Sequence, residues 1–196
     1  EPLSTLSYRD FTACKDWKHN LVSFTTLLYL AERDTVLCGL TAFDSDIVYE
    51  FDCPSGTFRS LDYPSVGEPF DIKIHRSFCR FSDGRVLGAT ACLHQEDQRR
   101  QAPGGKLFIL DPATRRFEIV GIPVPHDYIQ TITLDEQRGL VYGFTYPVFN
   151  FFVYDLNTRQ VRRIDYMGSI PHIIDLAPDG SYWATWNNRH HYLFCY

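Results

Sequence analysis

The stretch that decides the fold is Gly139-Leu-Val-Tyr-Gly-Phe-Thr-Tyr-Pro-Val-Phe-Asn-Phe-Phe-Val-Tyr-Asp-Leu-Asn-Thr-Arg-Gln-Val-Arg-Arg163. It is rich in aromatic and β-branched residues, which suit a pleated, half-buried surface. Two interruptions, at Tyr146-Pro-Val-Phe-Asn150 and Asp155-Leu-Asn-Thr-Arg159, contain residues that favour turns. The stretch therefore predicts three short strands folded back on one another.

Earlier parts of the chain, around 36–61 and 86–120, repeat this order of strands and turns. One equivalent position, two residues before a threonine, is always glycine: Gly39, Gly88 and Gly143. Another, at the end of each third strand, is always aspartate: Asp52, Asp111 and Asp155. Successive copies lie 44 to 59 positions apart. A repeat of roughly 40–50 residues with four strands per copy is typical of a β-propeller blade.

Both repeated residue types have a physical reason. An aspartate at the end of a strand can accept hydrogen bonds from backbone N–H groups two or three residues on, and so hold the following hairpin. A glycine in a middle strand suggests that close packing between blades leaves no room for a side chain. Both features therefore predict architecture rather than chemistry.

We expect one all-β domain with blade units of approximately 21–66, 67–122, 123–168 and 169–196. The chain of 196 residues then holds about three and a half to four blades. Propellers usually have about four to eight blades, so we expect this chain to be part of a larger propeller. The alternative is a four-bladed ring in which residues 1–20 supply the closing strand and remove an open sheet edge.

The hairpins Asp111-Pro-Ala-Thr-Arg115 and Asp155-Leu-Asn-Thr-Arg159 resemble the D-x-x-T-G hairpin of bacterial propellers. That group includes the streptogramin lyase, gluconolactonase and oligogalacturonate lyase relatives. The resemblance covers about residues 21–196 and concerns the blade, and Arg115 and Arg159 stand where those families usually have glycine. It implies a propeller fold, and it raises the expectation of a lyase or hydrolase.

Composition excludes some partners. The chain has a net charge of −5, whereas proteins that bind nucleic acid usually present a basic surface. No apolar run approaches the roughly 20 residues of a membrane-spanning helix, and the chain does not begin with a basic and then apolar leader. We therefore expect a soluble protein with neither nucleic-acid nor membrane partners, and the sequence predicts no compartment.

The six cysteines contain no C-x-x-C pair, which argues against a zinc ribbon or a thioredoxin-like site. Their even number permits disulfides. Cys38 and Cys79 lie in strand-like runs, where we expect small buried hydrophobic residues.

In a four-stranded meander, the loops between strands two and three lie at the same end as the connections between blades. Ligand sites of propellers tend to lie at that mouth of the central channel. Pro125-His126 and Pro171-His172 both lead into inner strands there. Imidazole suits acid–base catalysis or metal ligation near neutral pH. His126 and His172 are therefore the candidate catalytic residues, and the alternative is that each hydrogen-bonds within a blade junction.

The same end supplies the candidate ligand-binding residues, which lie in the long insertion 93–105 and in the loops of the third and fourth units. They are His94, Arg99, Arg100, Tyr146, Asn150 and His190. The insertion is interpreted either as a solvated hairpin or as a flap whose arginine faces a carboxylate. His190 and His191 are adjacent and would face opposite sides of a strand, so no metal site is predicted.

Two functional hypotheses follow. The first is a module that binds a small molecule, a saccharide, a protein partner or the remaining propeller blades through loops at one face of the channel. The second is an enzyme, a lyase or hydrolase, that acts on an anionic saccharide or lactone with the channel-mouth histidines. The sequence requires no cofactor, although a divalent metal is compatible with the histidines.

Overall fold

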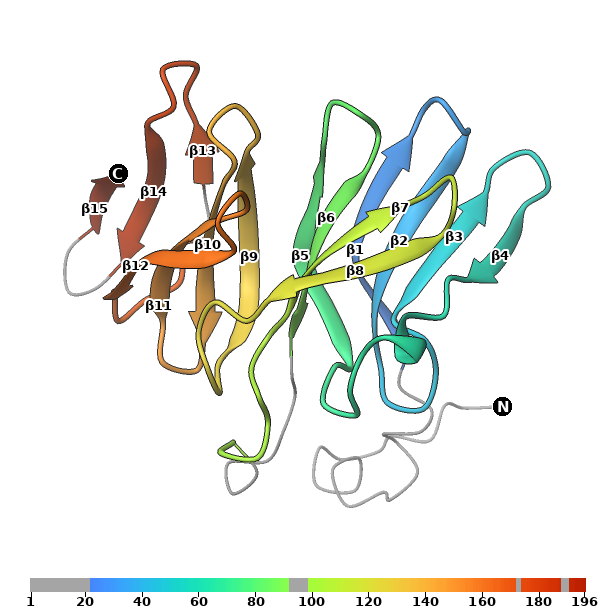
Figure 1. Cartoon of the computed structure of the whole chain (residues 1–196), viewed down its shortest axis with the longest axis horizontal. Coiled ribbons are helices and arrows are strands. Elements are labelled where there is room, and N and C mark those ends of the chain that lie inside the picture. The colour runs from blue at the N-terminus through green and yellow to red at the C-terminus, as the bar shows by residue number, and fades with distance from the viewer. Residues whose placement is uncertain (1–21, 92–98, 172–173, 188–190) are drawn as a thin grey trace, which may run out of the picture.

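The computed structural model describes residues 22–91, 99–171, 174–187 and 191–196. In these ranges most residues lie in antiparallel strands, which form four consecutive blades arranged as an open arc (Figure 1). The predicted architecture of four-stranded β-propeller blades is confirmed.

Each blade follows the chain order of its strands. Blade 1 contains β1 (Val22–Leu30), β2 (Thr35–Ala42), β3 (Val48–Asp52) and β4 (Thr57–Ser60). The 3₁₀-helix η1 (Tyr63–Ser65) leads to blade 2, with β5 (Lys73–Arg80), β6 (Val86–Ala91), β7 (Leu107–Asp111) and β8 (Arg116–Gly121). Blade 3 contains β9 (Tyr128–Asp135), β10 (Leu140–Tyr146), β11 (Asn150–Asp155) and β12 (Gln160–Tyr166). Blade 4 contains β13 (Ile174–Leu176), β14 (Tyr182–Asn187) and β15 (His191–Cys195).

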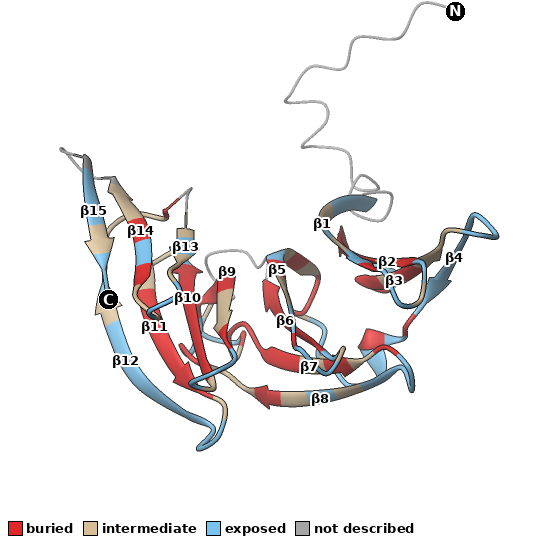
Figure 2. Cartoon of the chain, turned by 90° about the horizontal axis from the view of Figure 1, so that it is seen from above, coloured by how far each residue is buried: buried red, intermediate tan, exposed pale blue. Residues whose placement is uncertain are grey.

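The first strands of the blades line the concave side of the arc, and β4, β8 and β12 lie towards its convex side (Figure 2). Hydrogen bonds connect neighbouring inner strands. Thr25 donates to the carbonyl of Ile74, and the His75 ring bonds the Gln130 carbonyl at 2.8 Å. These side-chain bonds hold the inner strands together as a continuous concave surface. One backbone pairing, between Thr41 of β2 and Lys73 of β5, also joins blades 1 and 2.

The three largest hydrophobic clusters fill the spaces between blades. The first lies between blades 1 and 2 and includes Leu37, Val48, Ile74 and Phe108. The second lies between blades 2 and 3 and includes Leu87, Leu107, Ile129, Val141 and Phe152. The third lies between blades 3 and 4 and includes Tyr142, Phe151, Tyr182 and Ala184. Burial of these apolar side chains between stacked sheets is the main source of stability in such a repeat.

The repeated glycines have a more local cause than the one predicted. A methyl group added to Gly88 or Gly143 would come within 3 Å of a phenyl ring. That ring belongs to the residue paired with the glycine across the same blade, Phe108 or Phe152. At Gly39, Ile74 of the next blade also comes within 3 Å. The glycine therefore makes room for a cross-strand aromatic ring in blades 2 and 3, and for the neighbouring blade only in blade 1.

The repeated aspartates hold their hairpins as predicted. The carboxylate of Asp111 accepts a backbone N–H of Ala113 at 2.9 Å and the hydroxyl of Thr114 at 2.7 Å. Asp52 and Asp155 make equivalent bonds in blades 1 and 3.

The two arginines at the glycine position of these hairpins adopt the glycine conformation. Arg115 has φ 57° and Arg159 has φ 56°, close to the φ of 68° at Gly56 in the equivalent turn. Both side chains reach the preceding blade, where Arg115 pairs with Glu50 and Arg159 pairs with Glu118. The turn therefore keeps its backbone shape, and the arginine adds an ion pair between blades.

The described cysteines are thiols. Cys38 is buried as predicted, and Cys79 is partly buried against the second cluster. Burial raises the pKa of each to about 11, so both are protonated and weakly reactive near neutral pH. Cys14 and Cys92 lie outside the described residues.

The outer faces of the first and last blades expose apolar side chains. Phe24, Leu27 and Phe58 are each more than half exposed on blade 1, and Leu193 is 74% exposed on blade 4. Within the described part of the chain, these two blades therefore pack against a neighbour on one face only.

Candidate functional site

A buried aspartate precedes the inner strand of blade 3, at the end of the blades that also carries the connections between them. We call this the connection end. Asp127 is 2% exposed, and its carboxylate accepts hydrogen bonds from Thr145 and Asn150, each at 2.9 Å. Arg99 forms an ion pair with the other carboxylate oxygen at 2.5 Å. Three side chains from three separate segments therefore hold the Asp127 carboxylate.

Blade 2 has an equivalent network around Asp71. Its carboxylate accepts the Thr90 hydroxyl at 2.9 Å and the Lys106 ammonium at 2.7 Å, and Lys106 is 5% exposed. The backbone N–H of Lys106 donates to the Thr90 hydroxyl at 2.9 Å. Because the charge of Lys106 is paired and hydrogen-bonded, burial of this ion pair is tolerated.

These networks define the role of the repeated threonine. Thr90 and Thr145 end the second strands, and each joins the aspartate before the first strand to the residue that opens the third. All acceptor oxygens of the aspartates have partners within the protein, as expected for buried polar groups that stabilise a fold. The connection end is therefore a structural framework in blades 2 and 3.

The structure brings two predicted binding residues together there, because Arg99 and Asn150 both contact Asp127. The predicted arginine of the insertion does face a carboxylate, and that carboxylate belongs to the chain itself. Arg100 is exposed and Tyr146 is 38% exposed. The ring centroids of Tyr146 and Tyr128 lie 4.9 Å apart, so the two side chains form an aromatic pair at the same end.

His126 is exposed at the junction between blades 2 and 3. Its ring bonds the carbonyl of Ala102 at 2.8 Å, and its backbone N–H donates to the carbonyl of Pro103 at 3.0 Å. This geometry corresponds to the blade-junction alternative, and a catalytic role for His126 stays a prediction. The other three predicted site histidines, His94, His172 and His190, lie outside the described residues.

The inner strands form a cleft that the sequence did not single out. It has a volume of about 580 Å³, in the range of small-ligand sites. We call it the inner-strand cleft. Two lining residues come from β5, four from β9, and three from the segment around β13. They are His75, Arg76, Gln130, Thr131, Ile132, Thr133, Ile170, Pro171 and Ile174.

The electrostatics of the inner-strand cleft are set by one histidine and its cationic neighbours. Burial lowers the pKa of His75, and the positive charges of Lys73 and Arg76 lower it further, against the opposing effect of its bond to Gln130. Nδ1 donates to the Gln130 carbonyl, so the neutral ring keeps a lone pair on Nε2. No carboxylate is among the lining residues. The cleft is therefore suited to a polar or anionic group.

Arg76 occupies an unusual backbone position, with φ 47°, inside an irregular part of β5 between Ile74 and Phe78. Its carbonyl accepts the hydroxyl of Thr131 at 3.4 Å. A left-handed conformation at a non-glycine residue is uncommon and often occurs at functional positions. The irregularity turns His75 and Arg76 towards β9.

A cluster of metal ligands and a membrane-spanning helix are both absent from the described ranges. Nowhere in 22–91, 99–171, 174–187 or 191–196 do three His, Cys, Asp or Glu side chains converge as metal ligands would. Over the same ranges, no helix has the length and apolar character needed to cross a bilayer.

Comparison with solved structures identifies β-propellers. The β-propeller domain of Cps50 (Swd1) from Myceliophteria thermophila is 14% identical with a TM-score of 0.61, over 100% of this chain and 57% of that one. The dihydro-heme d1 dehydrogenase NirN is 12% identical with a TM-score of 0.57, over 87% of this chain and 34% of NirN. A luciferin-regenerating enzyme is 12% identical with a TM-score of 0.54, over 85% of this chain and 55% of that enzyme.

These similarities support the propeller fold and extend no further, because all identities are low. The chain spans less than two thirds of the length of each of these structures. No protein-family model and no curated protein matches the sequence. The lyase and lactonase families suggested by the hairpin motif are not distinguished by these comparisons.

Proposed function

We propose that this chain is a ligand-binding β-propeller module that takes a small anionic or strongly polar ligand in the inner-strand cleft. The observation that carries the proposal is the lining itself: His75 and Arg76 face this space with amide and hydroxyl groups of β9 and no carboxylate. Small-ligand sites commonly combine an apolar wall with a few converging polar groups. Ile170 and Ile174 supply that wall.

The connection end supports binding rather than catalysis as the first hypothesis. Its buried carboxylates are fully occupied by Lys106, Arg99 and Asn150. A carboxylate held in this way is a poor general base, because its lone pairs are already engaged. The predicted loop residues Arg99 and Asn150 thus support the walls of the module, and the inner strands offer the free polar groups.

The test is calorimetric titration with acidic oligosaccharides, and with neutral oligosaccharides of equal length as the control ligand. Arg76→Asn removes the cation and keeps a residue that tolerates positive φ. We expect it to weaken binding of the acidic ligand by about tenfold or more. Arg159→Asn, at an exposed arginine of positive φ outside the cleft, is the matched control and leaves the affinity unchanged.

The pH dependence gives a second measurement. An anion bound beside His75 favours the protonated imidazolium, so by linkage the affinity for it rises as the pH falls from about 7.5 to 5.5. His75→Asn keeps a donor for the Gln130 carbonyl and removes this dependence. Failure of all acidic ligands to bind the unmodified protein, or equal effects of Arg76→Asn and Arg159→Asn, would overturn the proposal.

The free Nε2 of His75 beside Arg76 favours one second candidate, an enzyme that acts on an anionic saccharide or lactone in the same cleft. A neutral imidazole of lowered pKa suits a general base, and an arginine suits a substrate carboxylate. Turnover of a bound acidic ligand that is lost in His75→Asn would favour the enzyme. Binding without turnover would favour the module.

A further inference from the structure

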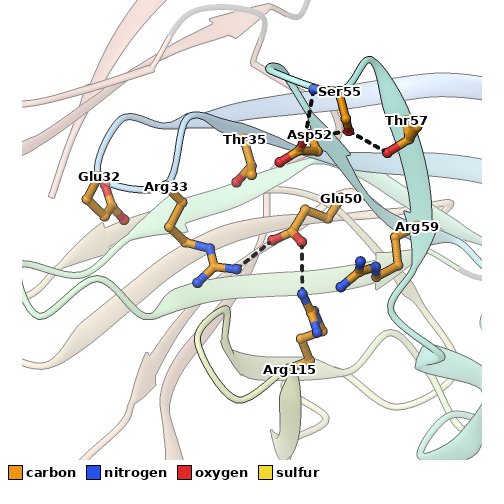
Figure 3. A pocket seen from close by; sticks show the side chains of 9 residues that line it. All are labelled: Glu32, Arg33, Thr35, Glu50, Asp52, Ser55, Thr57, Arg59 and Arg115. Carbon is orange, nitrogen blue, oxygen red and sulfur yellow. Dashed lines mark hydrogen bonds and ion pairs between the residues drawn. The ribbon is translucent and has the colours of Figure 1, made fainter.

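A second cleft lies at the opposite end of the blades, where the β1–β2, β3–β4 and β7–β8 turns meet. We call this the turn end. The cleft has a volume of about 450 Å³ and lies between blades 1 and 2 (Figure 3). All of its lining residues are charged or carry a hydroxyl group: Glu32, Arg33, Thr35, Glu50, Asp52, Ser55, Thr57, Arg59 and Arg115. We call it the arginine cleft.

Three guanidinium groups converge on one buried carboxylate. The Glu50 side chain is 8% exposed, and it pairs with Arg33 at 3.2 Å and Arg115 at 3.5 Å, through one nitrogen of each. Arg59 lies opposite Glu50 in the β3–β4 pairing and points towards Glu50 and Arg115 (Figure 3). Each guanidinium carries five N–H donors, so the bonds to Glu50 use a minority of those that Arg33 and Arg115 offer.

Two buried polar atoms of this cleft have no hydrogen-bond partner: the hydroxyl oxygen of Thr35 and Nε of Arg33. Thr35 is 3% exposed and lines the cleft. A buried donor without a partner is costly in a folded protein and requires an explanation. An acceptor-rich ligand in the cleft would satisfy both atoms.

The charges around the arginine cleft favour an anion. Of the two other carboxylates in its lining, Glu32 pairs with Arg80 at 2.7 Å, and Asp52 accepts the backbone N–H and hydroxyl of Ser55. Within the lining, Glu50 is the carboxylate that forms ion pairs with the arginines, so Arg33, Arg59 and Arg115 together carry more positive charge than this one partner neutralises.

We propose that the arginine cleft binds a tetrahedral oxyanion, a phosphate or sulfate group, through the guanidiniums of Arg33, Arg59 and Arg115 and the hydroxyl of Thr35. Arginine is the side chain whose planar fork of donors matches the oxygens of such groups, and hydroxyl donors commonly complete the set. The site is separate from the inner-strand cleft, so either proposal can fail without the other.

The first test uses inorganic phosphate and inorganic sulfate, titrated at constant ionic strength with chloride as the reference anion. We expect saturable binding by calorimetry and a thermal stabilisation that grows with phosphate or sulfate concentration, because a ligand that binds the folded state alone stabilises it. Stabilisation equal to that given by chloride would overturn the proposal.

The chain offers a matched pair of variants. Arg115→Gly and Arg159→Gly both replace an arginine of positive φ with the residue that best tolerates it, in equivalent turns of blades 2 and 3. Only Arg115 lines the arginine cleft. We expect Arg115→Gly to weaken oxyanion binding by about tenfold and Arg159→Gly to change it by less than about twofold. Equal effects would overturn the assignment of the site.

Thr35→Val separates binding from folding. It removes the unpartnered hydroxyl, keeps the shape of a β-branched residue in β2, and should leave stability unchanged or raised. We expect a loss of affinity of about threefold to tenfold. Unchanged affinity would remove Thr35 from the ligand set, and unchanged affinity in both Thr35→Val and Arg115→Gly would overturn the site.

The source of the oxyanion is addressed by a third arm, in which a phosphate monoester such as phenyl phosphate is titrated against inorganic phosphate. Tighter binding of the monoester identifies a phosphate or sulfate group carried on a larger molecule. Tighter binding of the inorganic ion identifies the free anion. Binding of neither in the unmodified protein would overturn the proposal.

Discussion

The two ends of the blades treat their buried polar groups differently. At the connection end, the carboxylates of Asp71 and Asp127 are bonded to side chains on every available side. At the turn end, the hydroxyl of Thr35, which lines the arginine cleft, is buried with no partner, whereas the hydroxyls of Thr90 and Thr145 at the connection end are bonded. Nε of Arg33 at the turn end and Nε of Arg99 at the connection end both lack a partner. A polar group whose bonds are all made within the protein stabilises the fold, and an unpartnered group that lines a cleft suits a ligand. The threonines therefore support an architectural role for the first end and the proposed oxyanion site at the second.

Removing the carboxylate of Asp127 tests the structural role of the connection end most directly. In Asp127→Ala, Arg99, Thr145 and Asn150 lose their shared acceptor, and Arg99 becomes an uncompensated charge. Because the Arg99 side chain is more than a third exposed and the other two groups are buried or partly buried, we expect the free energy of unfolding to fall by about 2–4 kcal/mol, measured by urea denaturation. Asp111→Ala, which removes a partly buried acceptor of turn hydrogen bonds, is the control and should cost much less. Similar losses in the two variants would contradict the structural role of the connection end.

Gly143→Ala tests the tight packing of the strands between the two ends. The added methyl group would come within 3 Å of the Phe152 ring, so we expect a loss of about 1–3 kcal/mol in the free energy of unfolding. Gly56→Ala is the control, because Gly56 has φ 68° and nothing within 4 Å of an added methyl group. That variant should lose only the conformational preference of glycine, about 1 kcal/mol. Equal losses would show that Phe152 moves aside readily.

His75 lies between the two ends, and its lowered pKa should make the free energy of unfolding depend on pH below neutrality. Its pKa is lowered in the folded protein by burial and by Lys73 and Arg76, so the unfolded chain binds its proton more readily. The contribution is fully present above the unfolded pKa of about 6.5 and is lost as the pH falls towards the folded pKa. We expect His75→Asn to remove this part of the slope, which one proton limits to about 1.4 kcal/mol per pH unit. An unchanged slope in the variant would place the titration elsewhere.

The smallest expected change in stability lies at the turn end, where Arg159 and Arg115 occupy equivalent turns. Arg159→Gly loses an exposed ion pair with Glu118 and gains a residue suited to φ 56°, so we expect a change within about 1 kcal/mol. Arg115→Gly removes one of two partners from the buried Glu50 and should be the more destabilising. Thermal unfolding of the two variants, side by side, measures the difference. A larger loss in Arg159→Gly would contradict the burial of the Glu50 pair.

Much of the blade was predictable because it depends on local chemistry that repeats. Asp111 and Asp155 hold their turns through bonds to residues two and three positions on, a pattern visible in the sequence alone. The framework role of Thr90 and Thr145 was missed, although each follows an aspartate, Asp71 or Asp127, at a similar distance along the chain. That repeated separation was the available signal.

The two clefts were less predictable, because they depend on contacts between blades. His75 and Arg76 reach β9 through an irregularity in β5, and a broken alternation of apolar residues was its only trace. Arg115 stood out as a departure from the glycine of the hairpin motif. Its partner Glu50 lies 65 positions away in another blade, and no local pattern connects them.

The three separate clusters between blades have a consequence for how the molecule opens. Blades 2 and 3 pack against neighbours on both faces, whereas blades 1 and 4, over the described residues, pack on one. A chain of units joined only to their neighbours loses its terminal units first. Amide hydrogens of β14 should therefore exchange with solvent before those of β6 and β10, and the exchange pattern should follow the order of blades along the arc.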